Sequence, residues 1–173
     1  VDLAEGRLPI IDLMNHIGYN AAALGNHEFD KGAALLQGAI SHANFPILCA
    51  NMQSGRQDMA TPSAAVTLKS KNGVRFRIAG VVTNFDGGHP EGSNEVYEGL
   101  TFSHPFEAAT DALAAAKRGE IRLLLSHMGD DKDVEYASTT ECCDVIIGGH
   151  THVVMDSVVN NVVVGQTGRK LKS

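Results

Sequence analysis

The sequence has no tryptophan, and Phe and Tyr together make up only 5% of its 173 residues. So few aromatic rings argue against a surface on which single-stranded bases stack. No apolar run approaches the roughly 20 residues of a membrane-spanning helix. Basic residues are the minority, with 14 Lys and Arg against 20 Asp and Glu and a net charge of −6. This balance argues against a nucleic-acid polymer or an anionic membrane as the main partner.

Cysteine is also scarce, with Cys49, Cys142 and Cys143. An odd number fits no closed disulfide framework. Cys49 and Cys143 lie beside apolar runs, which predicts buried thiols rather than metal ligands. The length predicts a single domain over residues 1–173. No secretory signal opens the chain and its first residue is not Met, so we expect a processed or partial product.

The hydrophobic periodicity alternates between helix and strand along the chain. Helices are predicted near residues 8–17, 32–43, 104–117 and 131–140. Strands are predicted within 19–24, 46–50, 121–125 and 145–147. Two hairpins are predicted, over 64–82 with a turn at Asn72-Gly73 and over 153–164 with a turn at Asn160-Asn161. Strands that alternate with helices predict an α/β layered fold.

Two helices carry specific expectations about burial. The first has apolar residues at helical spacing, which predicts one buried face: Leu8, Ile11, Leu13, Met14 and Ile17. In the second helix, the residues expected to point inward are Leu35, Leu36 and Ile40. Residues 84–99 form a long loop rich in Gly, Pro and acids, which is either a lid over a substrate or a plain surface loop.

Polar residues follow directly on three predicted buried strands. These residues are Asn26 and His27, then His127, then His150 and His152. Ligands bind at the carboxyl ends of strands in open α/β sheets, so these three loops should converge on one edge of the sheet. Imidazole nitrogens and an amide oxygen suit Zn²⁺, Mn²⁺ or Fe²⁺.

His150 and His152 are separated by one residue. In an extended loop their side chains point the same way, so the pair can serve one ion or two neighbouring ions. A single loop histidine is more often just solvated or hydrogen-bonded. That ordinary interpretation is preferred for the other four histidines, which are His16, His42, His89 and His104.

Three motifs in this order resemble the calcineurin-like metallophosphoesterases, a layered sheet sandwich flanked by helices. They are Gly25-Asn26-His27-Glu28-Phe29-Asp30, Ser126-His127-Met128-Gly129 and Gly149-His150-Thr151-His152. The strings Cys49-Ala50-Asn51 and Gly165-Gln166-Thr167-Gly168 are similar to strings of the 5′-nucleotidase/UDP-sugar hydrolase branch. The resemblance covers essentially the whole chain.

The resemblance implies a two-metal phosphoester hydrolase that acts on nucleotides. Asn26, His127 and His150 would bind one ion, and His152 would help to bind the other. His27 would lie beside the phosphoryl group as a catalytic residue, oriented by Asp30. Two such cations clamp phosphoryl oxygens and generate a hydroxide near neutral pH. For Glu28, we prefer charge compensation at the start of the following helix.

Two earlier motifs of the family, Asp-x-His and Gly-Asp, do not occur before Gly25. The second of them supplies a carboxylate that bridges the metals. We therefore expect a fold that is incomplete at its N-terminus, one bound metal or none, and little activity in this chain alone. A preceding segment and a C-terminal substrate-binding domain are the expected partners.

Two alternatives stay open on the sequence. One is a non-catalytic phosphoesterase-like fragment or a binding or assembly domain. The other is a phosphodiesterase that acts on cyclic nucleotides or related esters. The family resemblance implies a periplasmic or cell-surface location.

Overall fold

The computed structural model describes residues 8–85 and 88–168. Four α-helices lie in this part of the chain: α1 (Pro9–Ile17), α2 (Ala33–His42), α3 (Pro105–Ala114) and α4 (Asp130–Thr139). The strands are β1 (Ala22–Ala23), β2 (Ile47–Leu48), β3 (Met52–Ser54), β4 (Ala65–Lys69), β5 (Arg75–Val82), β6 (Leu100–Phe102), β7 (Glu120–His127), β8 (Val145–Ile147), β9 (Val154–Val159) and β10 (Val162–Thr167). Short 3₁₀ turns, η2 and η3, cover Asn26–Phe29 and Asn94–Tyr97.

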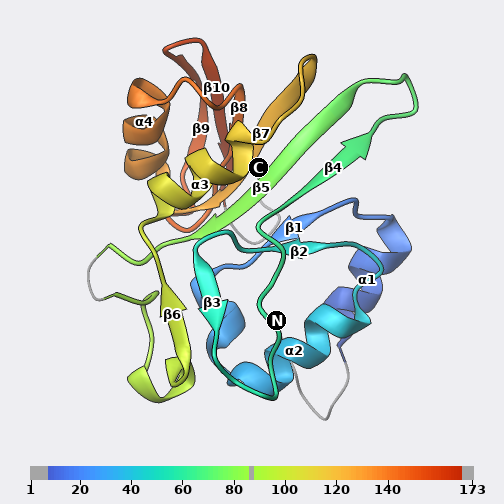
Figure 1. The fold of residues 1–173 in the computed structure, drawn as a ribbon, viewed down its shortest axis with the longest axis vertical. Coiled ribbons are helices and arrows are strands. Elements are labelled where there is room, and N and C mark those ends of the chain that lie inside the picture. Colours follow the sequence, from blue (N-terminus) through green and yellow to red (C-terminus); the bar gives the residue numbers. More distant parts are fainter. Residues whose placement is uncertain (1–7, 86–87, 169–173) are drawn as a thin grey trace.

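The main sheet has six strands in the order β4-β5-β7-β8-β10-β9. Its inner strands β5, β7, β8 and β10 run parallel, while β4 and β9 are antiparallel edge strands that belong to hairpins. Both hairpins turn where the sequence predicts, because Asn-Gly and Asn-Asn accept the positive φ that tight turns require. The predicted α/β layered fold is confirmed (Figure 1).

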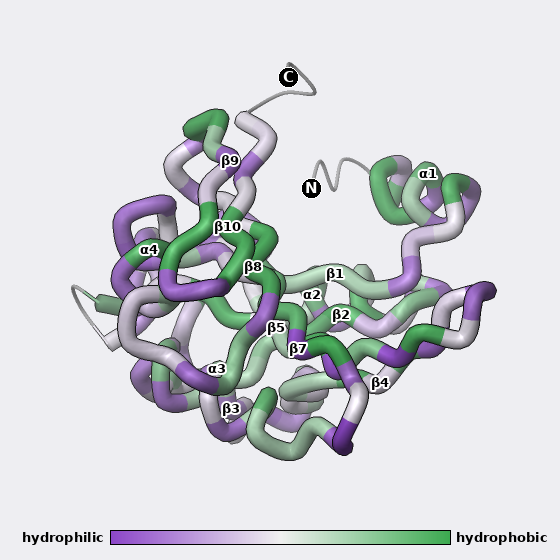
Figure 2. The backbone as a smooth tube through the Cα atoms, turned by 90° about the horizontal axis from the view of Figure 1, so that it is seen from above, coloured by the Kyte–Doolittle hydropathy of each residue, from purple (hydrophilic) through white to green (hydrophobic). Residues whose placement is uncertain are grey.

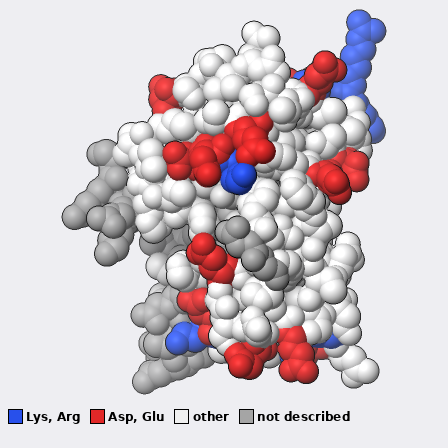
Figure 3. Space-filling model, turned by 90° about the vertical axis from the view of Figure 1, so that its left-hand side faces the viewer, with Lys and Arg blue, Asp and Glu red and all other residues white. Residues whose placement is uncertain are grey.

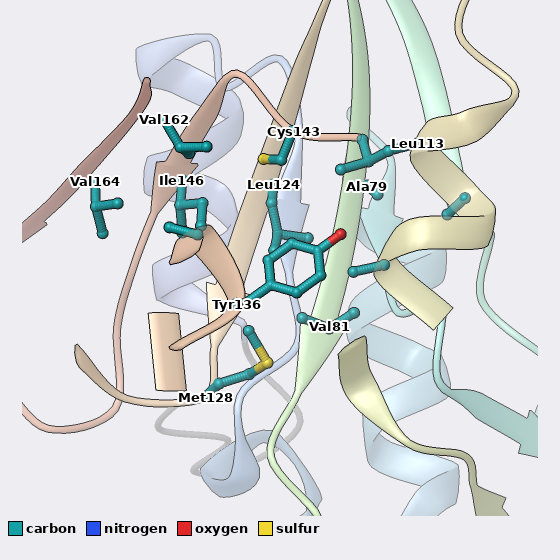
Figure 4. Packing of buried hydrophobic residues seen from close by; sticks show 13 residues of the cluster. Ala79, Val81, Leu113, Leu124, Met128, Tyr136, Cys143, Ile146, Val162 and Val164 are labelled. Carbon is teal, nitrogen blue, oxygen red and sulfur yellow. The ribbon is translucent and has the colours of Figure 1, made fainter. Parts of the chain in front are cut away.

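Helices α3 and α4 cover one face of the main sheet (Figure 1). Between them and the sheet lies a core to which Leu113, Leu124, Tyr136 and Ile146 contribute fully buried side chains (Figure 4). The alternating side chains of β5 divide between this core and the opposite face. Cys143 is buried in the same core, and Cys49 is buried on the other side of the sheet, as predicted for both thiols.

On the opposite face, β5 packs against the parallel pair β1-β2. The approach is closest at Gly80, where a Cβ atom would lie 2.7 Å from the carbonyl oxygen of Leu48. A second core forms here, with Leu24, Phe29, Leu36 and Val82 among its buried residues. This layer places the end of β1 against the carboxyl ends of β5 and β7.

Two expectations about helix burial are wrong in part. Only Ile11 of α1 is buried, and Leu13 and Ile17 are exposed, the latter at 63%. Helix α1 contacts the rest of the protein through the side that carries Ile11, and it projects to one side (Figure 2). In α2, Leu36 is buried as predicted but Leu35 is 44% exposed, because the helix packs through its Ala33, Leu36 and Ala39 positions.

Acidic side chains are more numerous than basic ones on the side that lies at the left of Figure 1, although most of this face is uncharged (Figure 3). Helix α4 opens with Asp130, Asp131 and Asp133, which is the favourable charge for a helix N-terminus. None of the helices in the described part of the chain is long and apolar enough to span a bilayer.

Candidate functional site

Asn26 opens a 3₁₀ turn directly after β1. Its side chain is only 4% exposed. The turn is closed by Glu28, whose carboxylate accepts a hydrogen bond from the Gly25 N–H at 2.8 Å. This contact gives Glu28 a local structural role, in line with the preference for charge compensation over catalysis.

His127 is the last residue of β7, and its ring reaches across to Asn26. The Nε2 atom of His127 lies 3.0 Å from Oδ1 of Asn26, although the two residues are 101 positions apart. Two glycines leave room for this ring. A Cβ at Gly25 would lie 2.7 Å from Cε1 of His127, and one at Gly149 would lie 3.1 Å from its Nδ1. Any larger residue at Gly25 would displace the imidazole.

His150 follows β8 and brings a second ring to the same place. The ring centroids of His127 and His150 are 5.2 Å apart. The three loops therefore converge at the carboxyl ends of the strands. Nε2 of His150 also lies 3.9 Å from a carboxylate oxygen of Glu91, which belongs to the loop over residues 88–99.

The conformation of the His150–His152 loop differs from the prediction. We expected an extended loop, but His150 has a φ of 83° and His152 a φ of 61°. Non-glycine residues in this left-handed region cost of the order of 1–3 kcal/mol each and persist only where their surroundings hold them. The loop turns sharply, and the His152 side chain is exposed to solvent. The structure gives no contact of the His152 ring with Asn26 or His127.

His27 and Asp30 form a pair at the surface beside this cluster. Nδ1 of His27 lies 3.0 Å from a carboxylate oxygen of Asp30, and both side chains are largely exposed. Such a contact fixes the ring orientation and the tautomer of the histidine. The two residues are only three positions apart in the sequence, so the contact is local to one turn of the chain.

Burial, with smaller contributions from the neighbouring histidines 150, 27 and 152, lowers the pKa of His127 to about 4. The imidazole is therefore neutral at physiological pH. A neutral imidazole keeps a lone pair for a metal ion, whereas an imidazolium does not. The site thus holds His127 in the protonation state that a ligand needs.

The pair formed by Asn26 and His127 fits neighbouring ligands of one divalent ion. Two ligand atoms at about 2.1 Å from a metal and at right angles are about 3.0 Å apart, which matches the distance between Oδ1 and Nε2. Within residues 8–85 and 88–168, no group of three or more His, Cys, Asp and Glu side chains is arranged to hold a metal ion.

Asp133 of α4 is fully buried beneath this site. Its Oδ1 accepts a hydrogen bond from the Ser126 hydroxyl, and its Oδ2 has no hydrogen-bond partner within the described residues. A Cβ at Gly148 would overlap Oδ2. Burial, with a smaller contribution from the nearby Asp130 and Asp131, raises the pKa of Asp133 to about 7, although the hydrogen bond from Ser126 opposes the shift.

The raised pKa of Asp133 predicts a pH dependence of stability. The folded state binds the proton more tightly than the unfolded state, whose carboxyl titrates near 3.8. The free energy of unfolding should therefore fall as pH rises, by roughly 2–3 kcal/mol between about pH 5 and 8. Urea titrations of metal-free protein across this range will measure it. In Asp133→Asn, the free energy of unfolding should fall much less over this pH range. The control Asp111→Asn, at an exposed position of α3, should show the same fall as the wild type.

No family model matches the chain. A probable 5′-nucleotidase of Treponema pallidum is 31% identical over 181 residues, which covers 99% of this chain and 29% of that protein. A snake venom 5′-nucleotidase of Gloydius brevicauda is 32% identical over 157 residues, with 84% and 25% covered. The solved structure of the calcineurin-like phosphoesterase YfkN from Bacillus subtilis superposes with a TM-score of 0.76 at 25% identity, covering 94% of this chain and 58% of that one.

The chain belongs to the calcineurin-like phosphoesterases, in their 5′-nucleotidase branch. It spans less than a third of the length of the curated relatives that it matches. The predicted membership of this branch is thus confirmed. The branch implies divalent metals in general, and the individual ligands of this chain belong to the proposal below.

Three residues at or beside this histidine cluster are not predicted from the sequence. Asp133 and Glu91 lie in segments interpreted as a weak helix and as a loop, and nothing in their local pattern points to the histidines. Gln166 is buried beside the His150–His152 loop. It was noted only as part of the Gly165–Gly168 string, and a buried amide in an apolar strand is the signal that could have found it.

Proposed function

We propose that this protein hydrolyses phosphoester bonds, those of nucleotides first, with divalent cations bound at the strand ends. The single observation that carries the proposal is the approach of Asn26 and His127 to 3.0 Å, with the ring of His150 alongside. These residues come from three separate loops. The separation of 3.0 Å suits a hydrogen bond when Nε2 of His127 carries the proton, and two ligands of one cation when it does not.

The proposed ligands are Asn26, His127 and His150 for one ion, with His152 for a second. When bound, the cations would polarise the phosphoryl group and lower the pKa of water. The protein contributes by holding the uncharged ligand atoms in fixed positions. Burial keeps His127 deprotonated, and the glycines at 25 and 149 let its ring sit between two loops.

His27 is the proposed catalytic side chain, and Asp30 its orienting partner. Their 3.0 Å contact leaves Nε2 of His27 directed away from Asp30 and available to a substrate. An imidazolium or proton donor there would stabilise the charge that develops on phosphoryl or leaving-group oxygens. Both side chains are exposed, so a substrate can reach them without rearrangement of the core.

The proposal extends to the organisation of the whole protein. Residues 1–173 are proposed to form part of one catalytic domain, and alone to hydrolyse little. The relatives' greater length supports a further segment that completes the site and a domain that recognises the substrate. An exported location is part of the same proposal, supported by a relative named as a venom enzyme.

The test is release of phosphate from AMP and UDP-glucose by the protein at its natural length, with Mn²⁺ or Zn²⁺. His27→Ala and His150→Ala should each lower kcat/KM by about 100-fold, as expected for loss of a proton donor or of a ligand. His16→Ala, at an exposed position of α1, is the control and should keep wild-type activity. Full activity in both site variants would mean that the assigned roles are wrong.

A further inference from the structure

Gln166 lies on β10, with its side chain facing the His150–His152 loop rather than solvent. It is only 3% exposed. In the orientation that satisfies both halves of its amide, Oε1 accepts a hydrogen bond from the His152 N–H at 2.8 Å and from the Val153 N–H at 3.1 Å. The same oxygen accepts from the Thr151 hydroxyl at 3.3 Å. One side-chain oxygen thus accepts hydrogen bonds from three consecutive residues, two in the loop and the one that follows it.

The backbone on either side of this loop is already fixed by β10. The Gly148 N–H donates to the Gly165 carbonyl at 2.8 Å, and the Gly168 N–H donates to the Val153 carbonyl at 3.0 Å. Between these two points the chain turns through His150 and His152, both with positive φ. An L-residue leaves that region readily unless its peptide groups are held. Gln166 holds the peptide groups at the second strained residue and at the one that follows it.

A further contact joins the loop to α4. The Asp130 N–H donates to the Thr151 hydroxyl oxygen at 3.2 Å, so the hydroxyl that donates to Gln166 also accepts from the helix N-terminus. The loop is therefore connected to the sheet through Gln166 and to α4 through Thr151. A carboxamide oxygen is suited to this position because its two lone pairs accept without adding charge beside the buried Asp133.

We propose that Gln166 is a positioning residue, which holds the strained loop so that His150 and His152 present their rings at the strand ends. The expected effect of Gln166 on metal binding rests on the proposed function. The expected effect of Gln166 on the loop backbone does not. The amide touches neither substrate nor the histidine rings. It acts only through the two N–H groups and the Thr151 hydroxyl.

The direct test is amide hydrogen exchange by NMR at about pH 6, on the protein at its natural length. In Gln166→Met, which keeps the side-chain length but has no acceptor, exchange at His152 and Val153 should accelerate at least about tenfold. The amide of Val164, in the middle of β10, should exchange at its wild-type rate. Gln53→Met, at an exposed position of β3, is the matched control and should leave exchange at His152 and Val153 unchanged.

Metal titration provides the second measurement. Gln166→Met should bind Mn²⁺ about tenfold more weakly, in the range seen when outer partners of ligands are removed, whereas Gln53→Met should keep the wild-type affinity. Unchanged exchange at His152 and Val153 in Gln166→Met, or equal acceleration there in Gln53→Met, would overturn the positioning role. If the wild type binds no Mn²⁺ and releases no phosphate, the proposed function fails, and the exchange rates still decide the role of Gln166.

Discussion

Gly80→Ala should destabilise the protein by about 4 kcal/mol or more, a large part of the roughly 5–15 kcal/mol by which native proteins are stable. The added Cβ would lie 2.7 Å from the carbonyl oxygen, 2.8 Å from the Cβ and 3.0 Å from the carbonyl carbon of Leu48. Two of these are backbone atoms of the facing layer, which cannot rotate away. The Gly80 carbonyl also accepts the Ala50 N–H at 2.6 Å, so separating the layers breaks this bond as well.

Urea unfolding followed by circular dichroism will measure the loss. The matched control is Gly38→Ala, inside α2, where an added Cβ would meet nothing within 4 Å. Because alanine is the better helix former, that variant should gain about 0.5–1 kcal/mol. The two substitutions add the same methyl group. If one lowers the free energy of unfolding and the other raises it, the effect of steric overlap is separated from that of backbone entropy. A Gly80→Ala protein within 1 kcal/mol of wild type would show that the layers are not in tight contact.

The sequence predicts those parts of the fold that are specified by a pattern of residues within one short segment. Strand alternation and the Asn-Gly turn specify the β4-β5 hairpin within 18 residues. Buried apolar runs that end in polar residues locate the carboxyl ends of β7 and β8. Since parallel strands end at one edge, the approach of His127 to His150 follows from topology without coordinates.

The parts that it does not predict depend on contacts between distant segments. Strands β3 and β6 pair antiparallel across about 50 residues, and each is too short to show a period. The exposed apolar side of α1 has the same spacing as a buried one, so periodicity cannot distinguish them. The positive φ of His150 and His152 depends on what Gln166 and the sheet hold in place, which no local pattern encodes.

His127→Ala should have the largest effect on function. It is the member of the cluster that contacts both other members, Asn26 at 3.0 Å and His150 at 5.2 Å between ring centroids. Its loss would remove the ring nitrogen that lies nearest to the Asn26 oxygen and would leave a cavity between Gly25 and Gly149. Affinity for Mn²⁺ should fall by more than about 100-fold and kcat/KM for AMP by more than about 1000-fold.

Calorimetric titration with Mn²⁺ and phosphate release from AMP will measure both effects. His42→Ala is the matched control, because His42 is an exposed histidine whose ring contacts Asp12 at 2.6 Å, in the α1–α2 layer. It removes an imidazole and a carboxylate contact without touching the strand ends, so both quantities should stay within about twofold of wild type. If the two alanine variants behaved alike, the half-buried, neutral His127 would have a structural role only, and the proposed hydrolysis of phosphoesters would have to take place elsewhere in the protein.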